Sequence, residues 1–332
     1  MITTKSINIL NLCVPCHNYC KYCLLSWDGN CIGIDYQRSV NYARKFYKWL
    51  KENHSDMNFM YYFGYSMEHP NLIEAIKFMQ ETNSPGGEFL QFDGMKMRTN
   101  EELTVLFNNL KNVGIKLVDF TIYGTQAYHD KFAARNGDYD LMIRSLDIAL
   151  KTGINVKVGI PITKENLNQL DELVEFFSTK DIPLFLFTPH SGGRGIHLLH
   201  SKITLEDYEQ LSDNVKKYIN RKNNKTPIEW LNTPIQEYQN RILTISLTPS
   251  NIEQLENQSF DETIKKLEEL DNKYYEVIPS FPELLKLYAN ENDHHLYSKK
   301  DLYLLYRNKY IKENNIQIHE VNDERFSGSI RF

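Results

Sequence analysis

The order of the apolar segments is the feature that most constrains how this chain can fold. Strand-like apolar runs alternate with segments of helical periodicity, which is the pattern of repeated βα units around a parallel sheet. Several runs are apolar almost throughout, as strands covered on both faces require. The predicted strands are residues 7–12, 59–63, 89–92, 117–122, 154–160 and 182–187.

The segments between these runs carry helix signals. Apolar residues recur there at spacings of three and four, which predicts amphipathic helices. Thr99 and Glu102 form a capping-box pattern at the start of one helix, and Gly153 stands where another should end. Six βα units without a seventh and an eighth predict an α/β fold, namely a partial, TIM-like (β/α)6 barrel.

The chain has 332 residues, which is enough for one such barrel and an appendage. We expect residues 1–220 to form the barrel and residues 221–332 to form an α-rich C-terminal extension that acts as a lid or in substrate recognition. The polar and basic stretch 221–225 is predicted to be a linker. Further on, residues 242–247 are a predicted strand, and the spacing of Tyr303, Tyr306 and Tyr310 indicates core packing.

Three cysteines just after the first predicted strand carry the strongest chemical signal. Cys16, Cys20 and Cys23 stand at C-x3-C-x2-C spacing. Four thiolates would complete the ligation of a 4Fe–4S cluster, whereas three leave one iron open. An open metal position is typical of catalytic sites rather than structural ones. Because ligands collect at the carboxyl ends of parallel strands, this location suits a catalytic cluster.

Other interpretations of these cysteines remain. A compact zinc site could also use Cys13 and His17, although structural zinc sites usually draw a second ligand pair from further along the chain, and no such pair follows. Disulfides are disfavoured because all five cysteines fall within the first tenth of the chain and no secretory segment is recognisable. Cys13 and Cys31 stay unassigned, with buried packing as the simpler role for each.

With the aromatic Tyr22 directly before Cys23, the motif resembles the signature of the radical S-adenosylmethionine (radical SAM) superfamily. The resemblance covers about residues 6–211. It implies a 4Fe–4S cluster held by the three cysteines and S-adenosylmethionine (SAM) as second cofactor, with Tyr22 shielding the cluster and backing the adenine. It further implies reductive cleavage of SAM, so that a 5′-deoxyadenosyl radical abstracts hydrogen from a peptide or small-molecule substrate. An external electron donor such as flavodoxin or ferredoxin would be needed.

The same resemblance assigns roles to residues at the ends of other strands. The segment with Gly64, Tyr65 and Glu68 occupies the place of the family's Gly-Gly-Glu segment, which binds the methionyl amine of SAM, but it lacks the paired glycines. An ordinary turn into a helix is the alternative. Thr121 matches a hydroxyl residue near the cofactor ribose, and Arg135 matches a basic position that pairs with the cofactor carboxylate. Without the resemblance, Arg135 would be a solvated charge.

Two glycine-containing loops complete the candidate site. Asp93-Gly94-Met95, after the third predicted strand, resembles the polar-glycine turn usual in the family, although an Asp-Gly turn needs no functional explanation. Residues 191–195, after the sixth predicted strand, include Arg194 among glycines, and this side chain could clamp an anionic group.

Composition limits the partners. A net charge of -5 argues against a wide basic surface for nucleic acid. No apolar run approaches membrane-spanning length, and residues 1–12 lack the features of a secretory signal, so we expect a cytoplasmic protein without membrane association. Three function classes stay open: a radical SAM enzyme with an oxidoreductase, isomerase or transferase outcome, a zinc-binding interaction module, and a non-catalytic iron–sulfur protein.

Overall fold

The structure is a computed structural model that describes residues 3–12, 16–23, 33–63, 67–84, 87–92, 94–235 and 240–317. Five positions that the sequence singled out lie outside these described residues: Cys13, Cys31, Gly64, Tyr65 and Asp93.

Parallel strands form the centre of the molecule. All six predicted strands are present, with ends that differ from the predicted ones by at most four residues. The strands are β1 (Thr3–Leu10), β2 (Asn58–Tyr62), β3 (Phe89–Phe92), β4 (Leu117–Thr121), β5 (Asn155–Pro161), β6 (Leu184–Phe187), β7 (Asn224–Lys225), β8 (Asn240–Ser246) and β9 (Tyr297–Ser298).

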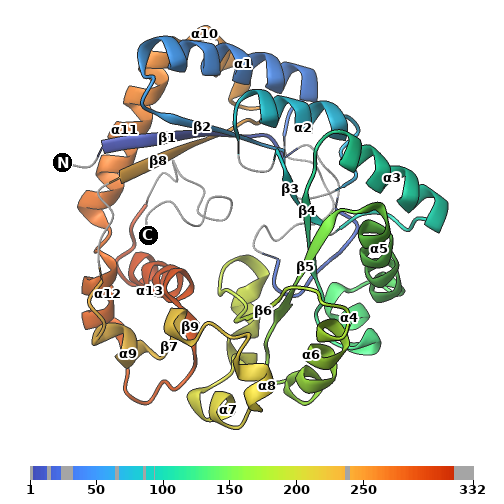
Figure 1. The fold of residues 1–332 in the computed structure, drawn as a ribbon. Coiled ribbons are helices and arrows are strands. Elements are labelled where there is room, and N and C mark those ends of the chain that lie inside the picture. Colours follow the sequence, from blue (N-terminus) through green and yellow to red (C-terminus); the bar gives the residue numbers. More distant parts are fainter. Residues whose placement is uncertain are drawn as a thin grey trace.

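The central strands form two parallel sheets, one in the order β2-β1-β8 and one in the order β3-β4-β5-β6. Together they curve around a common interior, with α1, α2, α3, α5 and α6 on the outside (Figure 1). Among the described residues no backbone ladder joins β2 to β3 or β6 to β8. The prediction of a partial rather than a closed barrel is therefore confirmed.

The C-terminal extension contributes a strand to this architecture. β8 runs parallel to β1 along its whole length, from the pair Thr3↔Asn240 to the pair Leu10↔Ser246. The helices α7, α8, α9, α12 and α13 lie in the arc between β6 and β8 (Figure 1). A strand from beyond residue 220 thus shares a sheet with β1. The division of the chain at residue 220 stays a prediction.

Helices connect and cover the strands. They are α1 (Tyr36–Asn53), α2 (Leu72–Glu81), α3 (Asn100–Asn112), α4 (Gln126–Ala133), α5 (Asp138–Thr152), α6 (Leu170–Ser178), α7 (Leu205–Glu209), α8 (Asp213–Lys216), α9 (Pro227–Leu231), α10 (Ile252–Asn257), α11 (Phe260–Val277), α12 (Phe281–Tyr288) and α13 (Lys299–Glu313), with 3-10 turns η1 (Leu167–Gln169), η2 (Gly193–Ser201) and η3 (Arg221–Asn223).

Local signals in the sequence set several helix ends. Thr99 and Glu102 form the reciprocal capping box at the start of α3. Gly153 ends α5 with φ of 81°, a left-handed conformation that glycine adopts without steric cost. Both predictions are confirmed.

The predicted linker at 221–225 is wrong. These residues form η3 and β7, and β7 pairs antiparallel with β9. Their polar side chains have fixed partners: Arg221 donates twice to the Glu229 carboxylate, at 2.8 and 2.9 Å, and Thr188 donates to Asn224 Oδ1 at 2.8 Å. A polar composition that suggests a linker is here explained by hydrogen bonding within a packed segment.

A second apolar cluster holds the extension together. Trp230, Tyr303 and Tyr306 are buried in it, Tyr310 packs against it, and Trp230 Nε1 donates to Tyr297 O at 2.9 Å. The predicted packing role of the tyrosines is confirmed. In the part of the chain that the structure describes, no helix has the length and apolar character needed to cross a membrane.

Candidate active site

The cysteine loop follows the carboxyl end of β1. Cys16, Cys20 and Cys23 are all partly exposed, and Cys23 N donates to Cys20 O at 3.2 Å. Buried Leu10 and Leu12, which lead into the loop, form an apolar floor against which Cys16 and Cys23 pack. The three sulfur side chains therefore lie on one short segment at the edge of the sheet where ligands collect.

Gly94, in the loop after β3, packs directly against Cys16. Its carbonyl accepts a hydrogen bond from His17 N at 2.7 Å, and its φ is +65°. A Cβ at this position would overlap with Cys16 Sγ. The glycine that the sequence marked as an ordinary or family-type turn is thus required for close approach of the cysteine loop.

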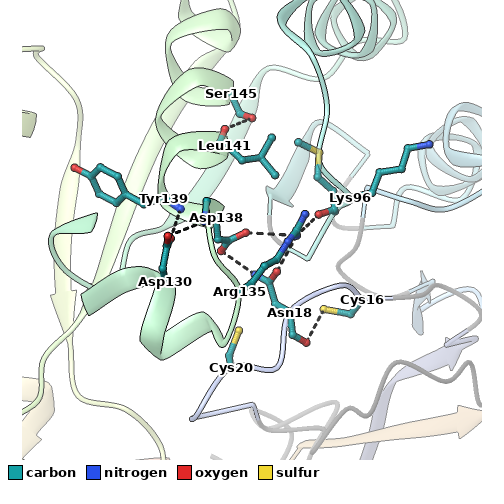
Figure 2. Close-up of polar contacts among 12 residues, drawn as sticks. Cys16, Asn18, Cys20, Lys96, Asp130, Arg135, Asp138, Tyr139, Leu141 and Ser145 are labelled. Atoms are coloured by element: carbon teal, nitrogen blue, oxygen red, sulfur yellow. Dashed lines mark hydrogen bonds and ion pairs between the residues drawn. The ribbon is translucent and has the colours of Figure 1, made fainter. Parts of the chain in front are cut away.

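Asn18 fastens the loop to the helices behind it. Its Nδ2 donates to Asp138 Oδ2 at 3.1 Å, and its Oδ1 accepts from Arg135 Nη1 at 3.0 Å (Figure 2). The same Arg135 nitrogen donates to Met95 O and lies 3.5 Å from Asp138 Oδ1. Arg135, predicted to pair with the cofactor carboxylate, is committed in this structure to contacts that join three segments around the loop.

Asp138 is buried, and its surroundings fix its orientation. Asp130 accepts from the backbone N–H groups of Gly137 (2.6 Å) and Tyr139 (2.8 Å), which holds the start of α5. His129 Nδ1 accepts from Tyr123 N at 3.1 Å, so its proton resides on Nε2, 3.1 Å from Asp138 Oδ2. The network therefore extends from the interior to Asn18 through a fixed carboxylate.

Aromatic side chains enclose the middle of the loop. Tyr123 OH lies 3.1 Å from Cys20 Sγ. The Tyr22 ring has its centroid 5.7 Å from that of Tyr123 and 5.7 Å from that of Phe132. Tyr22 thus faces the apolar wall beside Cys20, a position compatible with its predicted shielding role.

The loop after β6 closes over the cysteine loop. Arg194 Nε donates to Cys20 O at 2.9 Å, its backbone N donates to Cys23 O at 3.0 Å, and its guanidinium lies 3.7 Å from the centroid of the Tyr19 ring. The sequence suggested an anion clamp for Arg194. In the structure this side chain stacks on one residue of the cysteine loop and holds the backbone of another.

A buried ion pair ties the same β6 loop to α13. Lys202 Nζ lies 2.5 Å from Asp301 Oδ2 and also donates to Pro189 O, while Ser191 N donates to Asp301 Oδ1. The Lys202 and Asp301 side chains are 1% and 0% exposed. Sequence reasoning missed both residues because nothing local links positions about a hundred residues apart.

The remaining predicted cofactor residues lie around the same edge. Glu68 follows β2, and its Oε1 accepts from Arg98 Nη2 at 2.9 Å and from Lys96 N at 3.0 Å. Thr121 is the last residue of β4 and is buried. Arg135 contacts the Met95 carbonyl, and the next residue, Lys96, contacts Glu68. Glu68 and Arg135 therefore lie near each other, beside the cysteine loop. Their roles toward a cofactor stay predictions.

The sulfur ligands fit a cluster better than a single ion. Among the described residues, no three His, Cys, Asp or Glu side chains converge closely enough to hold one metal ion. A 4Fe–4S cubane binds each thiolate to a different iron, so its ligands surround a cage rather than one point. Three partly exposed thiols on one loop, two of them against an apolar floor, suit this group.

Fold and site together define a partial α/β-barrel protein with a loop of three free cysteines at the carboxyl edge of its sheet. A family model described as "Radical SAM superfamily" matches residues 10–177, slightly more than half of the chain. The chain belongs to the radical SAM superfamily.

Individual relatives are distant. A curated Fe-coproporphyrin III synthase from Methanosarcina barkeri is 28% identical over 105 residues, which is 31% of this chain and 26% of that protein. The solved structure of native anSMEcpe with bound AdoMet is 12% identical, covers 94% of this chain and 100% of its own, and has a TM-score of 0.50. Methylornithine synthase covers 56% of this chain and 54% of its own at 15% identity and a TM-score of 0.38. The chain thus matches only about a quarter of this curated relative, and the likeness to the anSMEcpe structure supports the fold alone.

Family membership fixes the class of protein, whereas the assignment of Cys16, Cys20 and Cys23 as metal ligands stays a prediction. The chain is an enzyme whose cofactors are a 4Fe–4S cluster and SAM, and membership implies cleavage of SAM at that cluster. The predicted enzyme class and cofactors are confirmed, whereas the substrate and the reaction on it stay predictions.

Proposed function

We propose that Cys16, Cys20 and Cys23 hold the 4Fe–4S cluster with one iron open to SAM, and that the enzyme acts on a peptide or small-molecule substrate. The observation that carries this proposal is the loop itself: three thiols after β1 at the carboxyl edge of the sheet, with Cys16 packed against Gly94. When bound, the cluster and SAM supply one-electron reductive cleavage, which gives methionine and a 5′-deoxyadenosyl radical that abstracts hydrogen from the substrate.

The chain's own residues bind and orient these groups. Asn18, Arg135 and Asp138 fix the cysteine loop from behind, and Arg194 fixes it from the β6 side. We propose that Glu68, oriented by hydrogen bonds from Arg98 and Lys96 N, faces the methionyl amine, since a fixed carboxylate suits an ammonium group.

Further residues shape the rest of the cofactor site. Thr121 would place its hydroxyl by the ribose, and Tyr22 would back the adenine against its aromatic neighbours. Gly64 and Tyr65, which lie outside the described residues, stay proposed cofactor-binding residues. For Arg135, the observed partners favour a role in holding the loop over direct contact with the cofactor carboxylate.

The partners follow from the chemistry. Reductive cleavage consumes one electron, so we propose an external donor such as flavodoxin or ferredoxin. We place the enzyme in the cytoplasm, where a cluster sensitive to oxygen is easiest to keep, and the net charge of -5 disfavours a nucleic acid substrate.

The test uses the full chain purified without oxygen, with SAM and dithionite. We expect iron and sulfide in equal amounts, no zinc, and formation of 5′-deoxyadenosine. Cys20→Ala should lose both the cluster and the product, whereas the matched control Cys31→Ala should keep both.

Two results would contradict the proposal. Zinc without sulfide would indicate an interaction module. Iron and sulfide without 5′-deoxyadenosine would indicate a non-catalytic iron–sulfur protein.

A further inference from the structure

The four-stranded sheet carries a charged pair on the face that its helices do not cover. Phe92 stacks on Phe107 of α3, with ring centroids 5.4 Å apart, and Phe120 lies 4.7 Å from Phe92. Since neighbouring residues in a strand point to opposite faces, Asp119 points away from these helices and toward the interior around which the strands curve (Figure 1). Thr121, two residues on, shares that face.

The strand register brings a lysine next to this aspartate. Asp119 pairs with Lys157 across the β4–β5 ladder, and Lys157 Nζ lies 3.0 Å from Asp119 Oδ2. The ammonium group also lies 5.0 Å from the centroid of Phe89 and 5.2 Å from that of Phe185. Two aromatic rings and one ion pair therefore form a single cluster on the inner face.

This cluster is open rather than packed. Phe89 and Phe185 are 37% and 38% exposed, and the Lys157 side chain is 32% exposed. Asp119 Oδ1 is covered and has no hydrogen-bond partner among the described residues. Its terminal torsion is soft, so the carboxylate can turn either oxygen toward a ligand arriving from the open side.

A line of aromatic contacts connects the cluster to the cysteine loop. Phe185 and Phe187 stack with centroids 5.7 Å apart, and Phe187 lies 6.4 Å from Tyr22, the neighbour of Cys23. Gly159 permits this arrangement, because a Cβ there would meet the Phe185 ring at 2.6 Å. A molecule anchored at the ion pair would thus reach along Phe185 toward the metal site.

Folding alone does not account for the arrangement. A partly exposed ion pair adds at most a little stability, whereas a covered acceptor without a partner is unfavourable. Apolar walls with a few polar groups that converge are typical of ligand sites. Burial raises the pKa of the Asp119 carboxyl, and the hydrogen bond from Lys157 opposes that shift.

We infer that Asp119, Lys157, Phe89 and Phe185 anchor the substrate, and that the substrate is a free α-amino acid. Its ammonium group would bind Asp119, its carboxylate would use the remaining donors of Lys157, and its side chain would lie along the phenylalanine rings toward Tyr22. An ion pair without net charge matches a zwitterion. A simple anion would be repelled by Asp119, and a simple cation would be repelled by Lys157. The inference rests on the proposed function and narrows its substrate from a peptide or small molecule to this class.

The test measures binding to the full-length, cluster-loaded enzyme without oxygen. The twenty standard L-amino acids are screened by thermal shift, and calorimetry then gives the affinity of the tightest one, its deaminated acid and its decarboxylated amine. We expect at least one amino acid to bind and both analogues to bind roughly 10- to 100-fold more weakly, as expected for losing a hydrogen bond to a charged group. Asp119→Asn and Lys157→Gln should each weaken the amino acid to a similar extent.

A matched control lies on the outside of the molecule. Lys180 pairs with Asp147 at 2.9 Å, lies 5.2 Å from the Phe176 ring and is 32% exposed, so it reproduces the local chemistry of Lys157 away from the interior. Lys180→Gln should bind the amino acid as the wild type does. Thermal midpoints of all variants separate loss of binding from loss of folding, and the isosteric Asp119→Asn is the variant least able to disturb packing.

The outcomes separate this inference from the proposed function. If no amino acid binds, if the deaminated acid binds as tightly as its parent, or if Asp119→Asn binds normally, the inference is overturned even while dithionite-driven 5′-deoxyadenosine formation persists. If the wild type binds an amino acid through Asp119 and Lys157 but never forms 5′-deoxyadenosine, the proposed function fails and the anchoring site stands.

Discussion

Replacing Asp301 by alanine would leave a lysine buried without its counter-ion. The Asp301 carboxylate binds Lys202 Nζ through one oxygen and Ser191 N through the other, and both side chains of the pair are inaccessible to solvent. The change removes both acceptors at once. Lys202 would keep the Pro189 carbonyl as its partner.

The size of the effect follows from burial. Removing one partner of a buried ion pair costs about 3–5 kcal/mol, and leaving a buried N–H such as that of Ser191 unsatisfied costs about 1–3 kcal/mol. Because Lys202 keeps one acceptor, we expect the lower part of the combined range, about 4 kcal/mol. The double variant Lys202→Met/Asp301→Asn removes both charges and keeps an acceptor for Ser191, so it should lose only about 1 kcal/mol.

Urea unfolding of the apo-protein under reducing conditions provides the measurement, completed as a double-mutant cycle with the single variants Asp301→Asn and Lys202→Met. Because each single variant leaves one buried charge unpaired, at a cost of about 3 kcal/mol, we expect a coupling energy of about 5 kcal/mol between the two positions. A loss below about 1 kcal/mol for Asp301→Ala, or a double variant no more stable than the single ones, would refute the reasoning.

Three further predictions concern the metal loop and pH. Gly94→Ala puts a side chain against Cys16 Sγ at a left-handed φ, which alone costs roughly 1–2 kcal/mol, so iron bound per chain should fall at least about twofold in an iron assay. Arg135→Ala removes the donor to Asn18 Oδ1, so the loop should open more often and the cluster absorbance should decay about tenfold faster in air. Burial lowers the pKa of His69 to about 4, so the unfolded chain takes up the proton first as pH falls, and stability should drop between pH 6.5 and 4. In urea titrations over that window, wild type should lose about 1.4 kcal/mol per pH unit more than His69→Gln.

Each of these has its control. Gly114→Ala carries a similar backbone strain, at φ of +95°, away from the cysteines, and should keep its iron. Arg44→Ala breaks an exposed pair with Glu81 and should leave the decay of the cluster unchanged. Equal iron in the two glycine variants, equal decay in the two arginine variants, or parallel pH curves for wild type and His69→Gln would each contradict the corresponding explanation.

Short-range signals predicted much of this molecule. The strands followed from runs of apolar residues, the start of α3 from Thr99 and Glu102, and the end of α5 from Gly153. The cysteine spacing alone singled out the loop of Cys16, Cys20 and Cys23, because residues within eight positions of each other need no tertiary information to be grouped. In each case the cause lies within about one turn or one strand of the residue concerned.

The long-range contacts could not be predicted from a single sequence. Asn18 and Asp138 lie 120 positions apart, and Lys202 and Asp301 lie 99 apart, so no local pattern pairs them. Parallel pairing of β8 with β1 was equally hidden, since an apolar run does not say which strand it joins. The neighbouring glycines suggested that Arg194 clamps an anion, whereas in the structure its guanidinium stacks on the Tyr19 ring.

The central claim is that three thiolates leave one iron of the cluster open for SAM, and the electron paramagnetic resonance spectrum of the reduced protein tests it most directly. The account predicts a 4Fe–4S signal whose g values change when SAM is added, and no such signal in Cys20→Ala. A spectrum that SAM leaves unchanged, or a cluster that persists without Cys20, would contradict it.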